Sequence, residues 1–456
     1  MNRLTVGLGR MGRWLLLLAP TLVLASELVL ANDVPKGTMP ADDKHMGVAT
    51  CASSLCHGSS KPLEATPVLQ NEYVTWSQFD PHSGAYRLLL NTESKEIARR
   101  MGIGPAHEAP ECLTCHAEVV PVEKRGPRFQ ATDGIGCESC HGGAERWLST
   151  HYQTPEITRA DNLLRGLVAL ERAEVRAETC TGCHVGAADK FANHRMMAAG
   201  HPRLVFELDT YTELWRTSGG RQHYRKDADY TQRKSLPASV NVWTVGLVEA
   251  ARQQVVLAEK HASPIPDFAI YACHSCHRDV RVDAFGDGKS AANGAAAGVL
   301  KALSTAPGDL RLQDGHARTL LVVADTLALP GREQLARSLG ALQQAANRNP
   351  ATIGRISKDI HGQLTELGAT LAAHPWNPTD KRRVLEAIVS AARGGAYPDP
   401  ASAEQVAMGM VVLLAGLDLD RQRRAEIDAL FAALQDDRSY DGKRFKSILE
   451  RTALGR

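Results

Sequence analysis

The pattern of hydrophobic and polar positions divides the chain into three stretches. Near the N-terminus an apolar run, Trp14 to Ala25, follows three arginines. Residues 32–285 show few long apolar periods, although helical spacing occurs in Asp161 to Glu178 and in Val245 to His261. Further along, leucines recur at helical spacing. We therefore predict a mainly α protein, in which a loop-rich region with few long helices precedes a C-terminal α-helical bundle.

The predicted bundle covers residues 301–456 and follows a Gly- and Ala-rich linker at 286–300. Proline after Asn377 predicts one helix start, and Ser402 with Gln405 predicts a capping box at another. The bundle has no cysteine, so we expect it to be dispensable for chemistry that needs thiols. A docking or dimerisation module is the functional alternative for it. Its apolar spacing is carried by these residues: Leu335, Leu339, Leu342, Leu364, Leu367, Leu371, Ile427, Leu430 and Leu434.

The N-terminal apolar run has the features of a signal peptide. Val29, Leu30 and Ala31 offer a cleavage position, so residues 1–31 are the predicted leader and the mature chain begins near Asn32. This predicts export to the periplasm, with membrane association only if the leader is uncleaved. The 53 basic and 51 acidic side chains nearly balance, which gives no support for nucleic-acid binding.

Ten cysteines form five pairs, and each pair is followed directly by a histidine. An exported protein would ordinarily form disulfides, and paired cysteines also make zinc sites or thioredoxin-like redox pairs. Neither disulfides nor zinc requires a histidine at the same offset every time, whereas c-type haem attachment does. The motif residues are Cys51, Cys56 and His57; Cys112, Cys115 and His116; Cys137, Cys140 and His141; Cys180, Cys183 and His184; and Cys273, Cys276 and His277.

The first motif, CASSLCH, has four residues between its cysteines where the other motifs have two. Its histidine offset is kept, and Ala52, Ser53 and Ser54 are small enough to bulge away from a porphyrin. We therefore predict five covalent haem c groups, with residues 32–285 as a pentahaem domain. Iron in electron-carrying haems commonly takes a second axial ligand, and histidines are the first choice for it here, ahead of Met196 and Met197.

Around these motifs the chain resembles the cytochrome c-554 family of multihaem cytochromes, relatives of the electron acceptor that serves hydroxylamine oxidation. The resemblance covers residues 45 to 190. It rests on the order of the first four motifs, on Trp76, on the run from His82 to Ala85 with Leu88, on Gly134-Ile-Gly before Cys137, and on His151.

The resemblance implies that His82 and His151 are distal ligands to haems attached elsewhere, with His151 reaching the iron of His57 and His82 that of His184. It also implies that one haem can lack a distal protein ligand. The long first motif, the fifth motif and the C-terminal bundle depart from the family pattern. For the extra haem, His194 and His201 are candidates by position, with His45 and His223 behind them; ordinary loop histidines are the alternative.

These features predict an exported multihaem cytochrome that transfers electrons between redox partner proteins through five haems and their iron. The alternative is a multihaem oxidoreductase that acts on a small nitrogen or sulfur species at one open haem. The sequence leaves open whether the protein is an enzyme, and it does not fix the oligomeric state.

Overall fold

The computed structural model describes residues 43–63, 68–153, 156–217, 228, 237–262, 265–277, 296–306, 308–435 and 440–451. The predicted leader, its cleavage position and His223 lie outside these residues. The described chain is mainly helical, as predicted, and its only β pairing consists of isolated bridges. Among the described helices, none combines the length and apolar character needed to cross a membrane.

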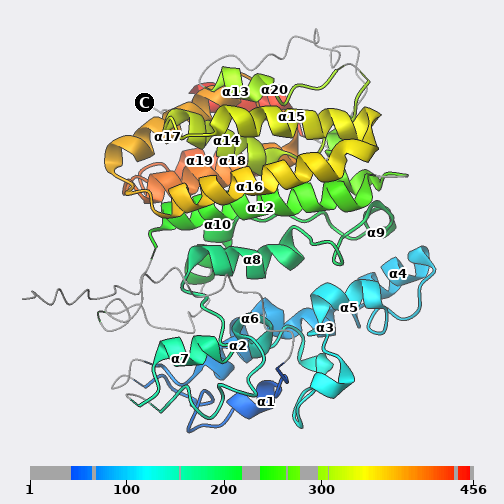
Figure 1. The fold of residues 1–456 in the computed structure, drawn as a ribbon, viewed down its shortest axis with the longest axis vertical. Coiled ribbons are helices and arrows are strands. Elements are labelled where there is room, and N and C mark those ends of the chain that lie inside the picture. Colours follow the sequence, from blue (N-terminus) through cyan, green and yellow to red (C-terminus); the bar gives the residue numbers. More distant parts are fainter. Residues whose placement is uncertain are drawn as a thin grey trace, which may run out of the picture. The chain divides into compact units, whose positions relative to one another are not determined.

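The first part of the described chain is built from short helices joined by loops, drawn in blue to green in Figure 1. Its α-helices are α1 (Val48–Cys51), α2 (Glu72–Phe79), α3 (Ala85–Leu88), α4 (Thr92–Met101), α5 (Pro110–His116), α6 (Cys137–His141), α7 (Arg159–Leu164), α8 (Ala173–His184), α9 (His194–Ala199) and α10 (Leu208–Thr217). Short 3₁₀ turns lie between them at Pro81–Gly84, Val122–Lys124 and Ala131–Asp133, and later at Phe268–Ile270 and Cys273–Ser275.

The predicted helix within Asp161 to Glu178 is wrong in its extent, because the chain forms α7 and α8 with a break between them. Gly166 lies in the break with φ +100°, a conformation that glycine adopts without strain. Its carbonyl oxygen would lie only 2.5 Å from a Cβ added at Gly142, just after the third motif. The break therefore lets the chain pass close to that motif.

Most helices in the rest of the described chain, in green to red in Figure 1, are longer. The helices of this part are α12 (Ser239–His261), α13 (Ala297–Lys301), α14 (Gly315–Thr326), α15 (Arg332–Arg348), α16 (Ile353–Ala372), α17 (Pro378–Arg393), α18 (Pro400–Ala415), α19 (Arg424–Ala432) and α20 (Gly442–Arg451), with a 3₁₀ turn at Pro350–Thr352. The helix α12 packs against α8, α10, α14, α16 and α18, and α15 packs against α16. All nine predicted apolar positions of the bundle are buried.

One continuous hydrophobic core runs from Val240 in α12 to Leu449 in α20. It crosses the predicted boundary at residues 286–300, where Val299 and Leu300 of α13 are buried in it. The division into a haem domain and a separate bundle stays a prediction, but α12 shares its core with the C-terminal helices. In the N-terminal region the buried apolar residues form only small clusters, such as the one around Leu89 and Ala106.

Two helix starts test the predicted capping. Asn377 caps α17 by accepting from Asp380 N, with Pro378 as the first helical residue, as expected. The predicted box with Ser402 as N-cap is wrong: α18 begins three residues earlier, with Asp399 as N-cap and Ser402 as the third helical residue. Pro400 at the first helical position is the signal that places this start.

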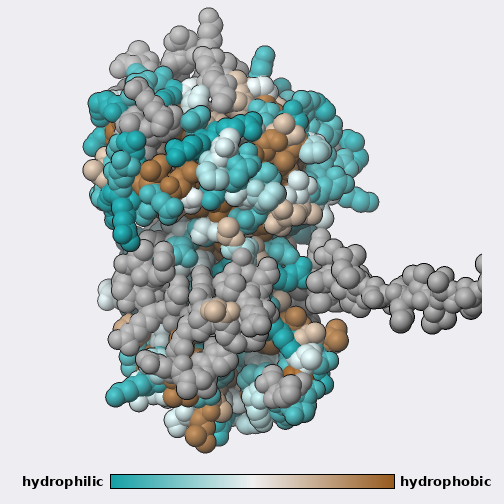
Figure 2. All heavy atoms as spheres, turned by 90° about the vertical axis from the view of Figure 1, so that its left-hand side faces the viewer, coloured by the Kyte–Doolittle hydropathy of each residue, from teal (hydrophilic) through white to brown (hydrophobic). Residues whose placement is uncertain are grey.

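The surface is mixed in character. Figure 2 shows hydrophilic residues over most of the C-terminal helices on the face in view, with hydrophobic residues scattered between them. Several large apolar side chains near the haem motifs are exposed, including Leu55 at 86% and Phe268 at 52%. Single exposed apolar residues are common on protein surfaces.

Candidate haem centres

The ten motif cysteines are all described, and none of them is in a disulfide. The second, third and fourth motifs each end a helix at their histidine, in α5, α6 and α8. The fifth motif begins on a 3₁₀ turn at Cys273. Two thiols on one helical turn followed by an imidazole fit the attachment of a haem by two thioether bonds.

The first motif closes onto the same backbone atom as a motif of ordinary length. In the fifth motif, His277 N donates to Cys273 O at 2.7 Å, across the usual two-residue gap. In the first motif, His57 N donates to Cys51 O at 3.2 Å although two more residues intervene. The extra residues form a turn in which Cys56 N donates to Ser53 O. The histidine thus keeps its place relative to the first cysteine.

Four of the motif histidines each face a second histidine from elsewhere in the chain. The ring centres are 6.1 Å apart for His57 and His151, 5.9 Å for His82 and His184, 6.4 Å for His116 and His201, and 6.1 Å for His194 and His277. Two imidazoles that bind one metal ion from opposite sides, each through a bond of about 2 Å, have ring centres about 6 Å apart. The spacing in all four pairs therefore fits a shared metal ion.

In five of these eight rings Nδ1 is hydrogen-bonded, which leaves the outer nitrogen, Nε2, available. Nδ1 lies 2.9 Å from Glu72 Oε2 in His57 and 2.9 Å from Asp80 Oδ1 in His82. Backbone carbonyl oxygens take this role for three others: Ala85 O for His116 at 3.1 Å, Leu148 O for His151 at 2.8 Å and Pro202 O for His201 at 2.7 Å. Metal-binding histidines typically donate their second N–H in this way, which fixes the ring orientation.

The electrostatic setting differs between the members of a pair. Hydrogen bonds to Glu72 and Asp80 raise the pKa of His57 and of His82 above the ordinary value. Burial lowers the pKa of His116 and of His151, and it lowers the pKa of His184 to about 4. Iron ligation needs a neutral imidazole, so burial favours the ligand form of these last three rings.

His45 lies in a different setting, beside Glu118 and Glu138. Its Nδ1 bonds to Glu118 Oε1, and its ring packs so closely on the third motif that a Cβ at Gly143 would lie 3.1 Å from its Cδ2. Glu138 is 2% exposed and accepts from three backbone N–H groups, those of Met46, Gly47 and Ala144, each at 2.7 Å. The third motif's own histidine, His141, ends α6, and its carbonyl accepts from Val168 N at 3.0 Å.

Thiols of different motifs also touch. A hydrogen bond joins Cys51 of the first motif to Cys137 of the third. Another joins Cys115 of the second motif to Cys183 of the fourth. These contacts place the attachment points of two pairs of motifs side by side.

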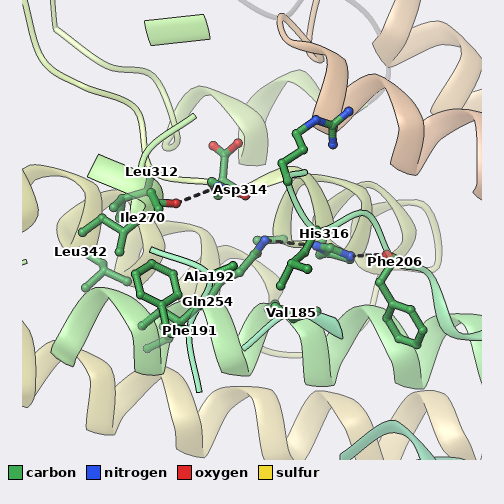
Figure 3. Close-up of a pocket in the computed structure, with 18 of the residues that line it drawn as sticks. Val185, Phe191, Ala192, Phe206, Gln254, Ile270, Leu312, Asp314, His316 and Leu342 are labelled. Atoms are coloured by element: carbon green, nitrogen blue, oxygen red, sulfur yellow. Dashed lines mark hydrogen bonds between the residues drawn. The ribbon is translucent and has the colours of Figure 1, made fainter. Parts of the chain in front are cut away.

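A cavity of about 90 Å³ lies beside α12 and α14, with an apolar lining that includes Phe191, Ile270 and Leu342 (Figure 3). His184 also lines it. In Figure 3, His316 bridges two groups: its Nε2 donates to Phe206 O at 2.9 Å, and its Nδ1 accepts from Gln254 Nε2 at 3.1 Å. Burial lowers the pKa of His316 to about 4. With both nitrogens engaged and its side chain buried, His316 is a core histidine.

The carboxylates that hold the ligand candidates are not among the residues predicted from the sequence. Asp80 stands two residues before His82 and caps the 3₁₀ turn that carries it, a local signal that could have been read. Glu72 and Glu118 are far from their histidines in sequence, by 15 and 73 residues, so only the fold brings them together.

The histidine pairs, their bonded Nδ1 atoms and the ten cysteines outside disulfides fit the class of c-type cytochromes, which transfer electrons through covalently bound haem c and its iron. Residues 43–142 match the model of the family described as cytochrome c554 and c-prime, and the chain is cytochrome c554-like over that segment. The match includes the first three motifs. No curated protein and no solved structure matches the chain.

Proposed function

We propose that the protein is an exported pentahaem electron-transfer protein, in which each of the five Cys–His motifs holds one haem c. The observation that carries this proposal is the set of four histidine pairs with ring centres 5.9 to 6.4 Å apart. The absence of disulfides among the ten described motif cysteines and the closure of the long first motif onto Cys51 O support attachment at every motif.

In this proposal the motif histidines are proximal ligands, and four residues supply the distal side. These are His151 for His57, His82 for His184, His201 for His116, and His194 for His277. The four pairs leave His45 as the remaining described candidate, and it lies beside the third motif. Bound haem iron would supply reversible one-electron chemistry, while these side chains bind it and fix its ligation.

Close packing of the motifs supports transfer between haems within one molecule. The thiol contacts join the first motif to the third and the second to the fourth. His194 and His201 are seven residues apart, in α9 and just after it, and each faces the histidine of a different motif. Seven residues span at most about 25 Å even when extended, so the fifth motif stays near the second.

Export to the periplasm and transfer to and from redox partner proteins complete the proposal. They rest on the apolar leader after Arg3, Arg10 and Arg13 and on the covalent attachment chemistry. The alternative, an oxidoreductase for a small nitrogen or sulfur species, needs an iron with an open position. The four histidine pairs favour the carrier, because each would saturate its iron.

The test of stoichiometry is intact-protein mass spectrometry after expression with a c-type maturation system. We expect the mass of five haems, and four haems for a double Cys51→Ala, Cys56→Ala variant. Four haems in the parent protein, with Cys51 or Cys56 open to alkylation, would contradict the fifth site. Titration with carbon monoxide and hydroxylamine separates the two functions: the carrier shows no stoichiometric Soret change, whereas turnover of hydroxylamine would favour the oxidoreductase.

A further inference from the structure

The paired histidines divide by what their Nδ1 atoms contact. Two of the eight, His57 and His82, bond to carboxylates, those of Glu72 and Asp80. His116 and His201, which form one pair, both bond to backbone carbonyl oxygens instead. The pairs therefore differ in whether a negative charge stands behind a ligand.

Both carboxylates are held in place. Glu72 is the first residue of α2, its side chain is 18% exposed, and its second oxygen, Oε1, accepts from Gln70 N at 3.2 Å. Asp80 is 11% exposed and uses one oxygen, Oδ1, for both the backbone N–H and the ring of His82, each at 2.9 Å. Because the local backbone fixes each carboxylate, its contact with the ring is a built feature of the fold.

A carboxylate that accepts from Nδ1–H makes the imidazole more basic at its other nitrogen. Stronger donation from Nε2 stabilises Fe(III) relative to Fe(II), so it lowers the reduction potential of the iron. A backbone carbonyl has the same effect to a smaller degree, because hydrogen bonds to ionised acceptors are roughly twice as strong as those to neutral ones.

We propose that Glu72 and Asp80 are potential-setting residues. Glu72 lowers the reduction potential of the haem held by His57 and His151, and Asp80 lowers that of the haem held by His82 and His184. The haem of His116 and His201, which has only backbone carbonyls behind its ligands, then has a higher potential than these two. An electron shared among these three sites resides mainly at the second motif. This inference rests on the proposed function, because it assumes the four histidine pairs as ligands.

The test uses Glu72→Gln and Asp80→Asn in the full haem-loaded protein. Both substitutions remove the charge and keep an acceptor oxygen on a side chain of the same shape. Asparagine is also a good N-cap for the turn after residue 80. Redox titration followed by electron paramagnetic resonance of the low-spin haems gives the readout. In each variant we expect one haem to become easier to reduce by about tenfold in its Fe(III)/Fe(II) ratio, which is about 59 mV for a one-electron couple.

Glu93→Gln and Asp359→Asn are matched controls, since both side chains are exposed and neither contacts a paired histidine. Unchanged potentials in Glu72→Gln and Asp80→Asn, with all haems still low-spin, would overturn the inference while leaving the proposed ligation intact. If Glu72→Gln loses a low-spin haem, the variant Glu72→Asp, which keeps the charge, shows whether the charge matters. Low-spin haem with a parent-like potential in Glu72→Asp supports the charge effect, and loss of the low-spin haem in both variants contradicts it. A parent protein with fewer haems or unligated iron would instead contradict the proposed function.

Discussion

The region of the first four haem motifs, residues 43–217, and the C-terminal helices have interiors of different kinds. From α12 to α20 a single core joins helices through fully buried residues such as Trp243, Leu320 and Ile388. Between residues 43 and 217 the helices are short and their buried apolar residues form only small clusters. Side chains alone fill the interior of the second region, whereas the first has space for the haems of the proposed function to supply its interior.

The helix α12 lies at the meeting point of the two regions. It is 23 residues long, and 14 of them are buried, on more than one face. It packs against α8, which carries the fourth motif, and against α14, α16 and α18. The region of the first four haem motifs therefore packs against α12, and α12 is itself buried by the C-terminal helices.

The largest expected effect comes from ending the chain near residue 287. Loss of α13 to α20 would expose Trp243, Leu247 and the rest of the α12 core face, so we expect the yield of soluble haem-loaded protein to fall severalfold or more. Removal of residues 452–456 alone is the control, because it leaves every described helix intact. A soluble truncated protein with the full haem spectrum would restore the expectation from sequence that the bundle is dispensable.

The second largest effect concerns haem-free protein, made without the maturation system. We expect proteases to cleave it rapidly between residues 43 and 217 and to leave a helical fragment that contains α12 to α20, because only the latter buries a continuous core. Limited proteolysis with mass spectrometry of the fragments provides the measurement. Equal protection of both regions without haem would remove the contrast between them.

Substitution within the shared core should have a smaller, local cost. Trp243 is fully buried and fits so closely that a Cβ at Gly409 would lie 2.8 Å from its ring. Trp243→Ala should lower the free energy of unfolding of the helical region by about 3 to 5 kcal/mol. Trp243→Phe should cost less, since the indole N–H is buried without a hydrogen-bond partner. Denaturation followed by circular dichroism measures both, and equal losses in the two variants would contradict this packing.

The smallest effect is a pH dependence near the join between the regions. Burial, with Glu207 beside it, raises the pKa of Asp209 to about 8. The carboxyl is thus protonated when folded and ionised when unfolded between its ordinary pKa of about 4 and about 8, so its contribution to stability falls as the pH rises through that range. Asp209→Asn should reduce this slope in unfolding experiments from pH 4 to 8. An unchanged slope would show that Asp209 does not titrate in this way.

The sequence predicts the features of both regions that depend on local spacing. The leucine periods located α15, α16 and α19, because helical spacing is a local property, and Asn377 with Pro378 located the start of α17. The break at Gly166 and the start at Asp399 were missed, the first because it depends on the close approach of Gly142. The Cys and His residues of the five motifs could all be identified from the sequence.

The distal ligand candidates could be predicted only in part from the sequence. The resemblance proposed His151 with His57 and His82 with His184, and the structure brings these rings together. His194 and His201 were both candidates for the extra haem. The structure places His194 opposite His277 of the fifth motif but His201 opposite His116 of the second motif, and no local signal distinguishes the two. His45 was a candidate for an iron ligand, and the structure places it with Glu118 and Glu138 beside the third motif.

The most direct test of the central claim is to replace the four proposed distal ligands one at a time. His82→Ala, His151→Ala, His194→Ala and His201→Ala should each convert one haem from low spin to high spin in the electron paramagnetic resonance spectrum, while intact mass still gives five haems. His374→Ala is the control, because its Nε2 bonds to Asp380 in the C-terminal helices. Spectra unchanged by the four substitutions would contradict the assignment of these pairs as iron ligands.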